Sequence, residues 1–168
     1  VLGDSCEPKD TMGILQRCRD SRLKTIKKIL LQDPEFSLHR IELDEINNYN
    51  LPTYETTLLS GTIQNRDLLR QGLPELKKTK PDHKNIGLLL SEHHTILRDV
   101  LDVSTPKIEM MLDAAMDAGA LGGKINGSGG GGCMFAYVPQ NPEKVVEAIN
   151  KSGGKAYIIH SDVGTRID

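Results

Sequence analysis

The chain has 168 residues, of which 38% are hydrophobic, and a formal net charge of −2 at pH 7. A chain of this length can bury a core of its own as one domain, and without a basic excess it is a poor candidate for nucleic-acid binding. No apolar run reaches transmembrane length, so we expect no membrane partner. The three cysteines lack CxxC spacing, which argues against a zinc site and fits a reducing, cytoplasmic setting.

The hydrophobic pattern predicts mainly helices up to residue 119. A strand end at residues 1–5 leads to a helix that Asp10 or Thr11 caps and that ends near Leu31. Further helices are expected at residues 44–48, from Thr53, after a cap at Asp82, and from Pro106 after a cap at Ser104 or Thr105. The amphipathic stripe of the first long helix comprises Met12, Leu15, Arg19, Leu23, Ile26, Ile29 and Leu30.

Strands appear in the pattern after Gly119. Residues 122–126 and 133–138 read as strands around a glycine-rich loop, a helix begins at Asn141–Pro142, and further strands are expected at 155–160 and 163–167. Together with the strand at the amino terminus, this order predicts an α+β fold. An antiparallel sheet would carry helices on one of its faces.

The glycine-rich loop places five glycines among the six residues 127–132. Glycine is used where φ must be positive or where another group approaches the main chain closely, and consecutive N–H groups in such a loop suit phosphate. The simpler alternative is a tight hairpin with flexible glycines. A dinucleotide-binding reading fails because a strand follows the glycines instead of a helix, and no Lys-Ser or Lys-Thr follows them as a nucleoside-triphosphate loop requires.

Two stretches carry a family resemblance. The run from Gly119 to Cys133, with its Gly-Gly-Lys approach, resembles the third motif of the GHMP kinases. The run Glu92-His93-His94-Thr-Ile-Leu-Arg-Asp99, followed by Val103-Ser104, is similar to a galactokinase pattern. The resemblance implies the ferredoxin-like fold of the GHMP kinase carboxyl-terminal domain with additional amino-terminal helices. Two galactokinase features are missing: a tyrosine near Arg17-Cys18, and a phenylalanine within the glycine loop.

The resemblance implies the carboxyl-terminal half of an ATP-dependent kinase that phosphorylates a sugar hydroxyl. The alternatives are another GHMP kinase, of heptose-phosphate or mevalonate type, or a non-catalytic relative that senses sugar and ATP. We expect residues 1–168 to be one domain cut from a longer protein, inactive alone. Its amino-terminal partner domain would hold most of the ATP and Mg²⁺ contacts and the catalytic residues, and without that domain the exposed face of the fragment would favour self-association.

Within this chain the resemblance assigns a phosphate-side wall and no catalytic or metal-binding residue. Thr11 is a weaker candidate on the substrate side. Because His93 and His94 are adjacent, they point about 100° apart on a helix and do not suit one metal ion, so His94 is expected to pack. The wall comprises Asn126, Gly127, Ser128, Gly129, Gly130 and Gly131.

Overall fold

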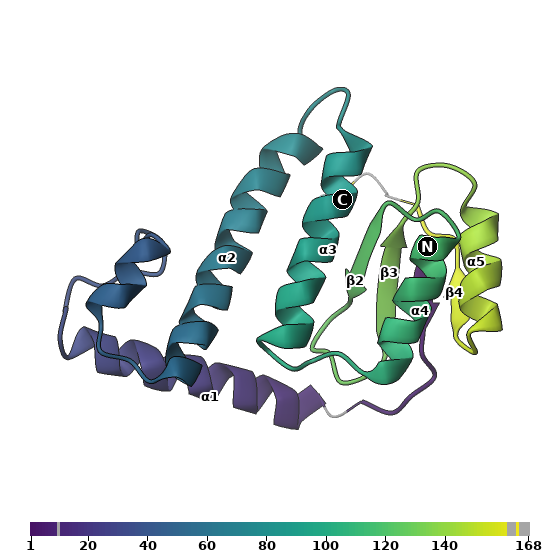
Figure 1. The fold of residues 1–168 in the computed structure, drawn as a ribbon. Coiled ribbons are helices and arrows are strands. Elements are labelled where there is room, and N and C mark those ends of the chain that lie inside the picture. Colours follow the sequence, from purple (N-terminus) through teal and green to yellow (C-terminus); the bar gives the residue numbers. More distant parts are fainter. Residues whose placement is uncertain (10, 161–163, 165–168) are drawn as a thin grey trace.

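A four-stranded antiparallel sheet forms one half of the molecule (Figure 1). The computed structural model describes residues 1–9, 11–160 and 164. The strands are β1 (Leu2–Asp4), β2 (Gly122–Ile125), β3 (Cys133–Tyr137) and β4 (Lys155–Tyr157), in the order β2-β3-β1-β4. Helices α4 (Pro106–Asp117) and α5 (Pro142–Lys151) complete a β-α-β-β-α-β unit, which confirms the expected ferredoxin-like α+β fold. The strand expected at 163–167 falls, except for Gly164, outside the described residues.

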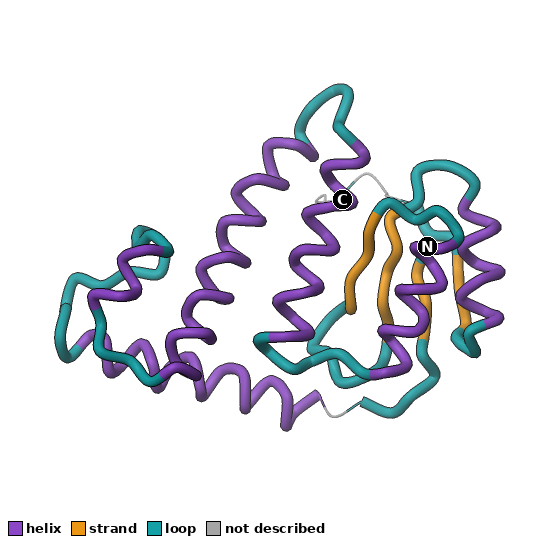
Figure 2. The backbone as a smooth tube through the Cα atoms, viewed as in Figure 1, coloured by secondary structure: helices purple, strands orange, loops and turns teal. Residues whose placement is uncertain are grey.

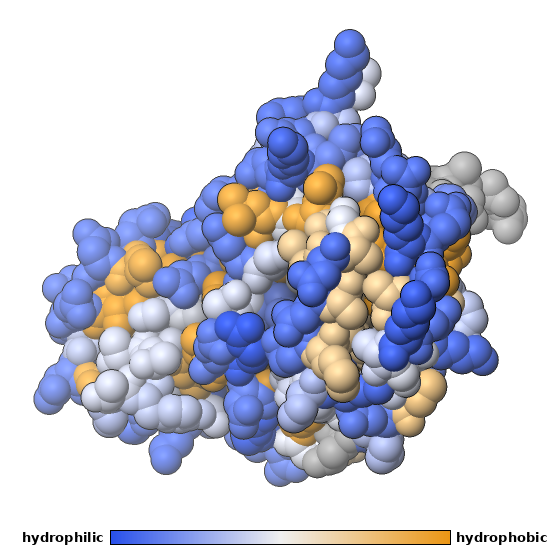
Figure 3. All heavy atoms as spheres, turned by 45° about the vertical axis from the view of Figure 1, so that its right-hand side comes forward, coloured by the Kyte–Doolittle hydropathy of each residue, from blue (hydrophilic) through white to orange (hydrophobic). Residues whose placement is uncertain are grey.

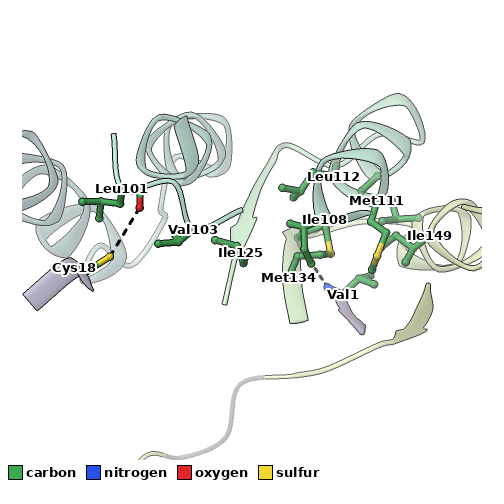
Figure 4. Close-up of a cluster of buried hydrophobic side chains, with 14 of the residues drawn as sticks. Val1, Cys18, Leu101, Val103, Ile108, Met111, Leu112, Ile125, Met134 and Ile149 are labelled. Carbon is green, nitrogen blue, oxygen red and sulfur yellow. Dashed lines mark hydrogen bonds between the residues drawn. The ribbon is translucent and has the colours of Figure 1, made fainter. Parts of the chain in front are cut away.

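Alternating side chains give the sheet one buried face. Met134 and Ala136 of β3 are buried, whereas Cys133, Phe135 and Tyr137, which alternate with them, are half-buried. The buried face packs against α4 and α5 in the main hydrophobic cluster, part of which is drawn in Figure 4. At Gly3 a Cβ atom would lie 2.8 Å from the terminal carbon of Met111 on α4, and therefore the central strand has no side chain at this point.

The other helices lie between β1 and α4 in the chain. They are α1 (Thr11–Leu30), the short 3₁₀ helix η1 (Asp44–Asn48), α2 (Thr53–Leu76) and α3 (His83–Asp99). Figures 1 and 2 show α2 and α3 side by side, with α3 next to β2 and α1 across their ends. A second hydrophobic cluster joins α1 and α2 to the segment between them, through Ile29, Ile41, Ile46, Leu59 and Ile63.

Two of the predicted helix caps are present. Asp82 accepts hydrogen bonds from the backbone N–H groups of Lys84 and Asn85, at 3.0 and 3.1 Å. Thr105 accepts one from the N–H of Ile108 at 3.3 Å, and Pro106 stands in the first turn, where it lacks only an N–H that would be unpaired. Of the other candidates, Asp10 lies outside the described residues, Thr11 is the first residue of α1, and Ser104 precedes the cap of α4.

The expected apolar stripe of α1 is not its buried face. Met12 is 76% exposed and Leu15 is 51% exposed, and Ile29 is the one residue of the stripe that is buried; the other buried residues of the helix, Cys18 and Thr25, lie outside the stripe. The helix therefore packs with a face about a third of a turn away from the stripe. Thr25 is tolerated there because its hydroxyl donates to the carbonyl oxygen of Ser21, so the prediction was wrong for most of the stripe.

The surface is mixed in character. On the side drawn in Figure 3, hydrophobic side chains gather in separate patches among hydrophilic ones. Exposed apolar residues occur on α1, α2 and α4, including Leu23, Leu69 and Met110. Among the described residues, no helix combines the length and the hydropathy needed to cross a membrane.

Candidate functional site

The glycine-rich loop between β2 and β3 has a backbone that other residues rarely adopt. All five of its glycines have φ between +72° and +100°. The loop is closed at its base by the N–H of Asn126, which donates to the carbonyl oxygen of Cys133 at 2.8 Å. Side chains other than glycine are strained in this conformation, which explains the composition of the loop.

The middle of the loop packs against its own chain. A Cβ atom on Gly129 would lie 2.4 Å from the carbonyl oxygen of Val103, and one on Gly130 would lie 2.1 Å from Cδ1 of Ile14. The N–H of Gly130 donates to the same carbonyl of Val103 at 2.7 Å. Close internal approach therefore requires glycine here, and the N–H of Gly130 is already engaged within the chain.

The first residues of the loop form its open end. Asn126 and Gly127 are exposed, and Ser128 is half-buried. The ammonium nitrogen of Lys9 lies 3.1 Å from the position that a Cβ on Gly127 would take. Ser128 Oγ donates to Oγ1 of Thr11, the first residue of α1, at 3.4 Å. A glycine turn, a lysine and a helix amino terminus meet here, and each of them favours a bound anion.

The structure thus divides the expected wall into two parts. Ser128 lies next to Thr11, as a shared site would require, whereas Gly129, Gly130 and Gly131 pack inward against Val103, Ile14 and the Glu7–Pro8 pair. Lys9 is not among the site residues that the sequence predicts. Its position two residues before the start of a helix was its only signal in the sequence, and no local pattern connects it to Gly127, which lies 118 positions further along the chain.

His94 connects α3, β2 and α4 beneath the loop. Its Nδ1 accepts a hydrogen bond from the N–H of Ile125 at 3.2 Å, and its Nε2 is 2.8 Å from Oε1 of Glu109. A nitrogen that accepts from an amide carries no proton, so Nε2 carries the proton and donates to the carboxylate. His94 is 6% exposed and packs between the elements as expected, with two hydrogen bonds that orient its ring.

Glu109 gathers three hydrogen bonds in this network. Besides His94, Ser104 Oγ donates to Oε1, and Arg98 donates to Oε2 at 3.3 Å. Burial alone would raise the pKa of Glu109, but the Ser104 hydrogen bond and the His94 and Arg98 contacts outweigh it and hold the pKa below its ordinary value. Since Ser104 follows Val103, the network fixes the segment against which Gly129 and Gly130 pack.

Arg17 of α1 holds the same segment from the other side. Its guanidinium donates to the carbonyl oxygens of Leu101 and Asp102, at 3.0 and 2.7 Å. Figure 4 shows Leu101 and Cys18 facing one another, with Val103 further along this segment. Asp102 has a φ of +50°, so the guanidinium stabilises a turn that the backbone alone would not favour.

The described residues do not supply a metal site. No group of three or more His, Cys, Asp or Glu side chains in this part of the chain is arranged to hold an ion. The chemistry offered by the open end of the loop is therefore that of anion contact through Lys9, hydroxyl groups and backbone N–H groups.

Comparison with known proteins identifies the family. Residues 71–155 match the family described as "GHMP kinases C terminal". A mevalonate kinase from Thermococcus onnurineus is 46% identical over 84 residues, which are 49% of this chain and 25% of that protein. A galactokinase from Enterococcus faecalis is 34% identical over 76 residues, which are 44% of this chain and 20% of that protein. The chain thus spans about a quarter of the length of the curated relatives it matches.

The fold also matches a solved structure along almost all of this chain. The galactokinase of Lactococcus lactis, solved with galactose, has a TM-score of 0.79 and 16% sequence identity, covering 90% of this chain and 40% of that one. The match extends beyond the family segment, and at this identity it bears on the fold alone. The glycine loop and the His94 run both lie within the matched family segment, and the chain belongs to the GHMP kinase family as a carboxyl-terminal domain.

Proposed function

We propose that this chain is the carboxyl-terminal half of an ATP-dependent kinase that transfers a phosphoryl group to a hydroxyl of a small molecule. The observation that carries the proposal is the open end of the glycine loop, where Lys9 and Thr11 meet Gly127 and Ser128. Phosphoryl transfer depends mainly on positioning and on stabilising negative charge, and these groups suit both tasks.

Each group at the open end has a distinct role. Gly127 lets a phosphate oxygen approach the main chain without meeting a side chain. The Lys9 ammonium offsets negative charge on the phosphate. The hydroxyls of Thr11 and Ser128 offer hydrogen bonds to the phosphate or to the acceptor molecule. The inward-facing glycines Gly129–Gly131 keep the loop rigid behind this surface.

ATP and Mg²⁺ are the cofactors of the proposed reaction, and this chain provides only part of their site. No described cluster of carboxylates fits Mg²⁺. We assign the metal ion, the main phosphate loop and the catalytic base to an amino-terminal partner domain, so the 168 residues alone should transfer no phosphate.

A sugar is the first acceptor to test, and mevalonate is the second. Support for a sugar comes from the galactokinase-like run between Glu92 and Ser104, and from a fold match that includes the region of α1 to α3. Support for mevalonate comes from the 46% identity within the carboxyl-terminal segment. Galactose, mevalonate and a heptose phosphate should be assayed side by side with the protein that joins this chain to its nucleotide-binding half.

A pair of glycine variants tests the site. Gly127 and Gly119 both have positive φ, at +79° and +104°, and nothing lies within 4 Å of the position of a Cβ on Gly119. Gly127→Ala should lower kcat/KM by at least about tenfold through blocked phosphate approach, whereas Gly119→Ala should cost stability alone. Lys9→Met should raise the KM for ATP or the acceptor, and Lys9→Arg should restore part of the loss.

Two results would count against this assignment. Equal activity of the Gly127→Ala and Gly119→Ala proteins would remove the glycine loop from the site. ATP-dependent phosphorylation by the isolated 168 residues would contradict the assignment of the metal ion, the main phosphate loop and the catalytic base to a separate amino-terminal domain.

A further inference from the structure

Helix α1 has a second apolar side, which the fold leaves exposed. Its inner side carries the buried residues Cys18, Thr25 and Ile29. At about 100° per residue, five other apolar side chains fall within a sector of about 80° on an adjoining side of the helix. Four of them are 39–76% exposed, and the fifth is half-buried. We call this set the outer ridge, and it consists of Met12, Leu15, Leu23, Ile26 and Leu30.

A helix that is apolar on two sides is normally covered on both of them. The inner side of α1 is covered, because Cys18 and Ile29 belong to the two hydrophobic clusters of the molecule. A helix of this length spans about 30 Å. Figure 1 shows it at the edge of the molecule, across the ends of α2 and α3. An exposed apolar ridge along such a helix is typical of a surface that another protein layer covers.

The charges on α1 favour an acidic partner for the ridge. The helix contains six basic residues and a single acidic residue, Asp20. Arg19 lies within the sector of the ridge, its side chain is 71% exposed, and its described contact is with the neighbouring Asp20. Lys24 and Lys27 are exposed beside the ridge, where they and Leu23 line an open hollow of about 550 Å³. Because the same helix of a second copy would bring like charges together, a surface with carboxylates fits the ridge better.

The ridge begins beside the proposed phosphate site. Met12 follows Thr11, whose Oγ1 accepts a hydrogen bond from Ser128 Oγ at 3.4 Å. In the proposed function, the other wall of that site belongs to an amino-terminal nucleotide-binding half. The galactokinase with the matching fold is covered over 40% of its length, so more than half of that chain lies outside the match. A domain that closes the site at Thr11 also reaches the first turn of the ridge.

We propose that the outer ridge of α1 is the docking surface for the amino-terminal nucleotide-binding half, which covers it with apolar side chains and places carboxylates opposite Arg19 and Lys27. The inference rests on the proposed function, since that function supplies the partner. Docking along α1 fixes the position of the partner's phosphate loop relative to Thr11, and this alignment of the two walls is what phosphoryl transfer requires.

Methionine oxidation measures whether the ridge is covered. Dilute hydrogen peroxide converts exposed methionines to sulfoxides, which mass spectrometry quantifies residue by residue. Met12 is 76% exposed, and Met110 and Met116 on α4 are 49% and 42% exposed. In the longer protein, which joins this chain to its nucleotide-binding half, Met12 should oxidise at least about tenfold more slowly than in the isolated chain, as expected for a docked population of about 90%. The oxidation rates of the two methionines on α4 serve as the internal control and should stay nearly unchanged.

Matched substitutions test the apolar and the charged parts of the ridge. Leu23→Asp and its control Leu88→Asp replace leucines that are 45% and 55% exposed. In the longer protein, Leu23→Asp should restore the rapid oxidation of Met12, whereas Leu88→Asp should leave Met12 protected. Lys27→Glu should also restore the oxidation, and Lys144→Glu, at an exposed position of α5, should not. Circular dichroism should show that each variant is folded before it is oxidised.

The outcomes separate this proposal from the proposed function. If Met12 oxidises equally fast in the longer protein and in the isolated chain while the longer protein phosphorylates its acceptor, the docking surface is wrong and the proposed function stands. Protection of Met12 in the isolated chain that rises with protein concentration would assign the ridge to a second copy and overturn the proposal. Protection of Met12 in a longer protein without kinase activity would support the docking surface and contradict the proposed function.

Discussion

Gly87 of α3 and Gly122 of β2 meet backbone to backbone. A Cβ atom on Gly122 would lie 1.8 Å from the carbonyl oxygen of Gly87, and one on Gly87 would lie 2.1 Å from the carbonyl oxygen of Leu121. This approach lets side chains of α3 reach the outer edge of the sheet. His94 accepts from the N–H of Ile125, and Ser91 Oγ lies 3.4 Å from the N–H of Gly123. The helix thereby covers a strand edge that would otherwise be free to pair with another chain.

Alanine at Gly87 should separate the helix from the sheet. We expect Gly87→Ala to lower the free energy of unfolding by about 3 kcal/mol or more, because neither backbone can move away without losing the His94 contact. Gly72→Ala, also within a helix, should instead raise it by about 0.5–1 kcal/mol. Urea unfolding of the two variants gives the comparison, and similar stabilities would show that the contact between α3 and β2 is loose.

Arg17 should matter more than its neighbour Arg19. Arg17 donates to two carbonyl groups of the 101–102 turn, whereas the described contact of Arg19 is with Asp20 next to it in the sequence. Because Arg17 is partly exposed, we expect Arg17→Ala to cost about 1 kcal/mol and Arg19→Ala less than about 0.5 kcal/mol. Thermal unfolding measures both. A larger loss of stability from Arg19→Ala than from Arg17→Ala would contradict the proposed role of Arg17 in holding the 101–102 turn.

The Glu109 carboxylate should make stability depend on acid pH. Its pKa is lowered in the folded protein, so its contribution is complete above the unfolded pKa near 4.5 and is lost as pH falls through the folded value. The unfolding free energies of the native chain and Glu109→Gln should differ by a constant amount above pH 6 and converge below pH 4.

Glu147 provides the control for this titration. Its pKa is also lowered, by an exposed contact with Lys151. Glu147→Gln should therefore change stability little at any pH. A gap between the native chain and Glu109→Gln that stays constant down to pH 3 would mean that the ionised form of Glu109 does not stabilise the fold.

The two faces of α1 should respond differently to truncation. Ile29 is fully buried and Leu15 is half-exposed. Ile29→Ala should cost about 2–5 kcal/mol, whereas Leu15→Ala should stay within about 0.5 kcal/mol. Chemical denaturation of both variants tests which face of the helix carries the core. Comparable losses would mean that the side of the helix that carries Leu15 also packs against the core.

Local signals in the sequence were sufficient for most elements. Period-two alternation and turn residues located β2 and β3, and side chains with a known capping role marked the starts of α3 and α4 at Asp82 and Thr105. These signals depend on contacts within a few residues, so the packing of distant segments does not alter the structure that they predict. The family resemblance of the glycine run was also confirmed, by the match of residues 71–155 to the family.

Contacts between segments that are distant in the sequence could not be predicted from these local signals. The buried face of α1 depends on Cys18 and Thr25, which are less hydrophobic than the exposed Met12 and Leu15. The inward packing of Gly129 depends on Val103, and the approach of Lys9 to Gly127 spans most of the chain. Periodicity reports that a helix has an apolar side, but it does not report which side the rest of the protein covers.

The position of β1 in the sheet has a consequence for folding. The first strand of the chain stands between β3 and β4, and its residue Leu2 pairs with Phe135 and Tyr157. During synthesis the helices α1 to α3 can form from local contacts, but β1 must wait for β3 and β4, which follow all three of these helices in the sequence. Pairing across such separations is entropically costly and slow. Closure of the sheet around β1 is therefore expected to be a late step of folding, and the helical half of the molecule should gain protection from hydrogen exchange before the sheet does.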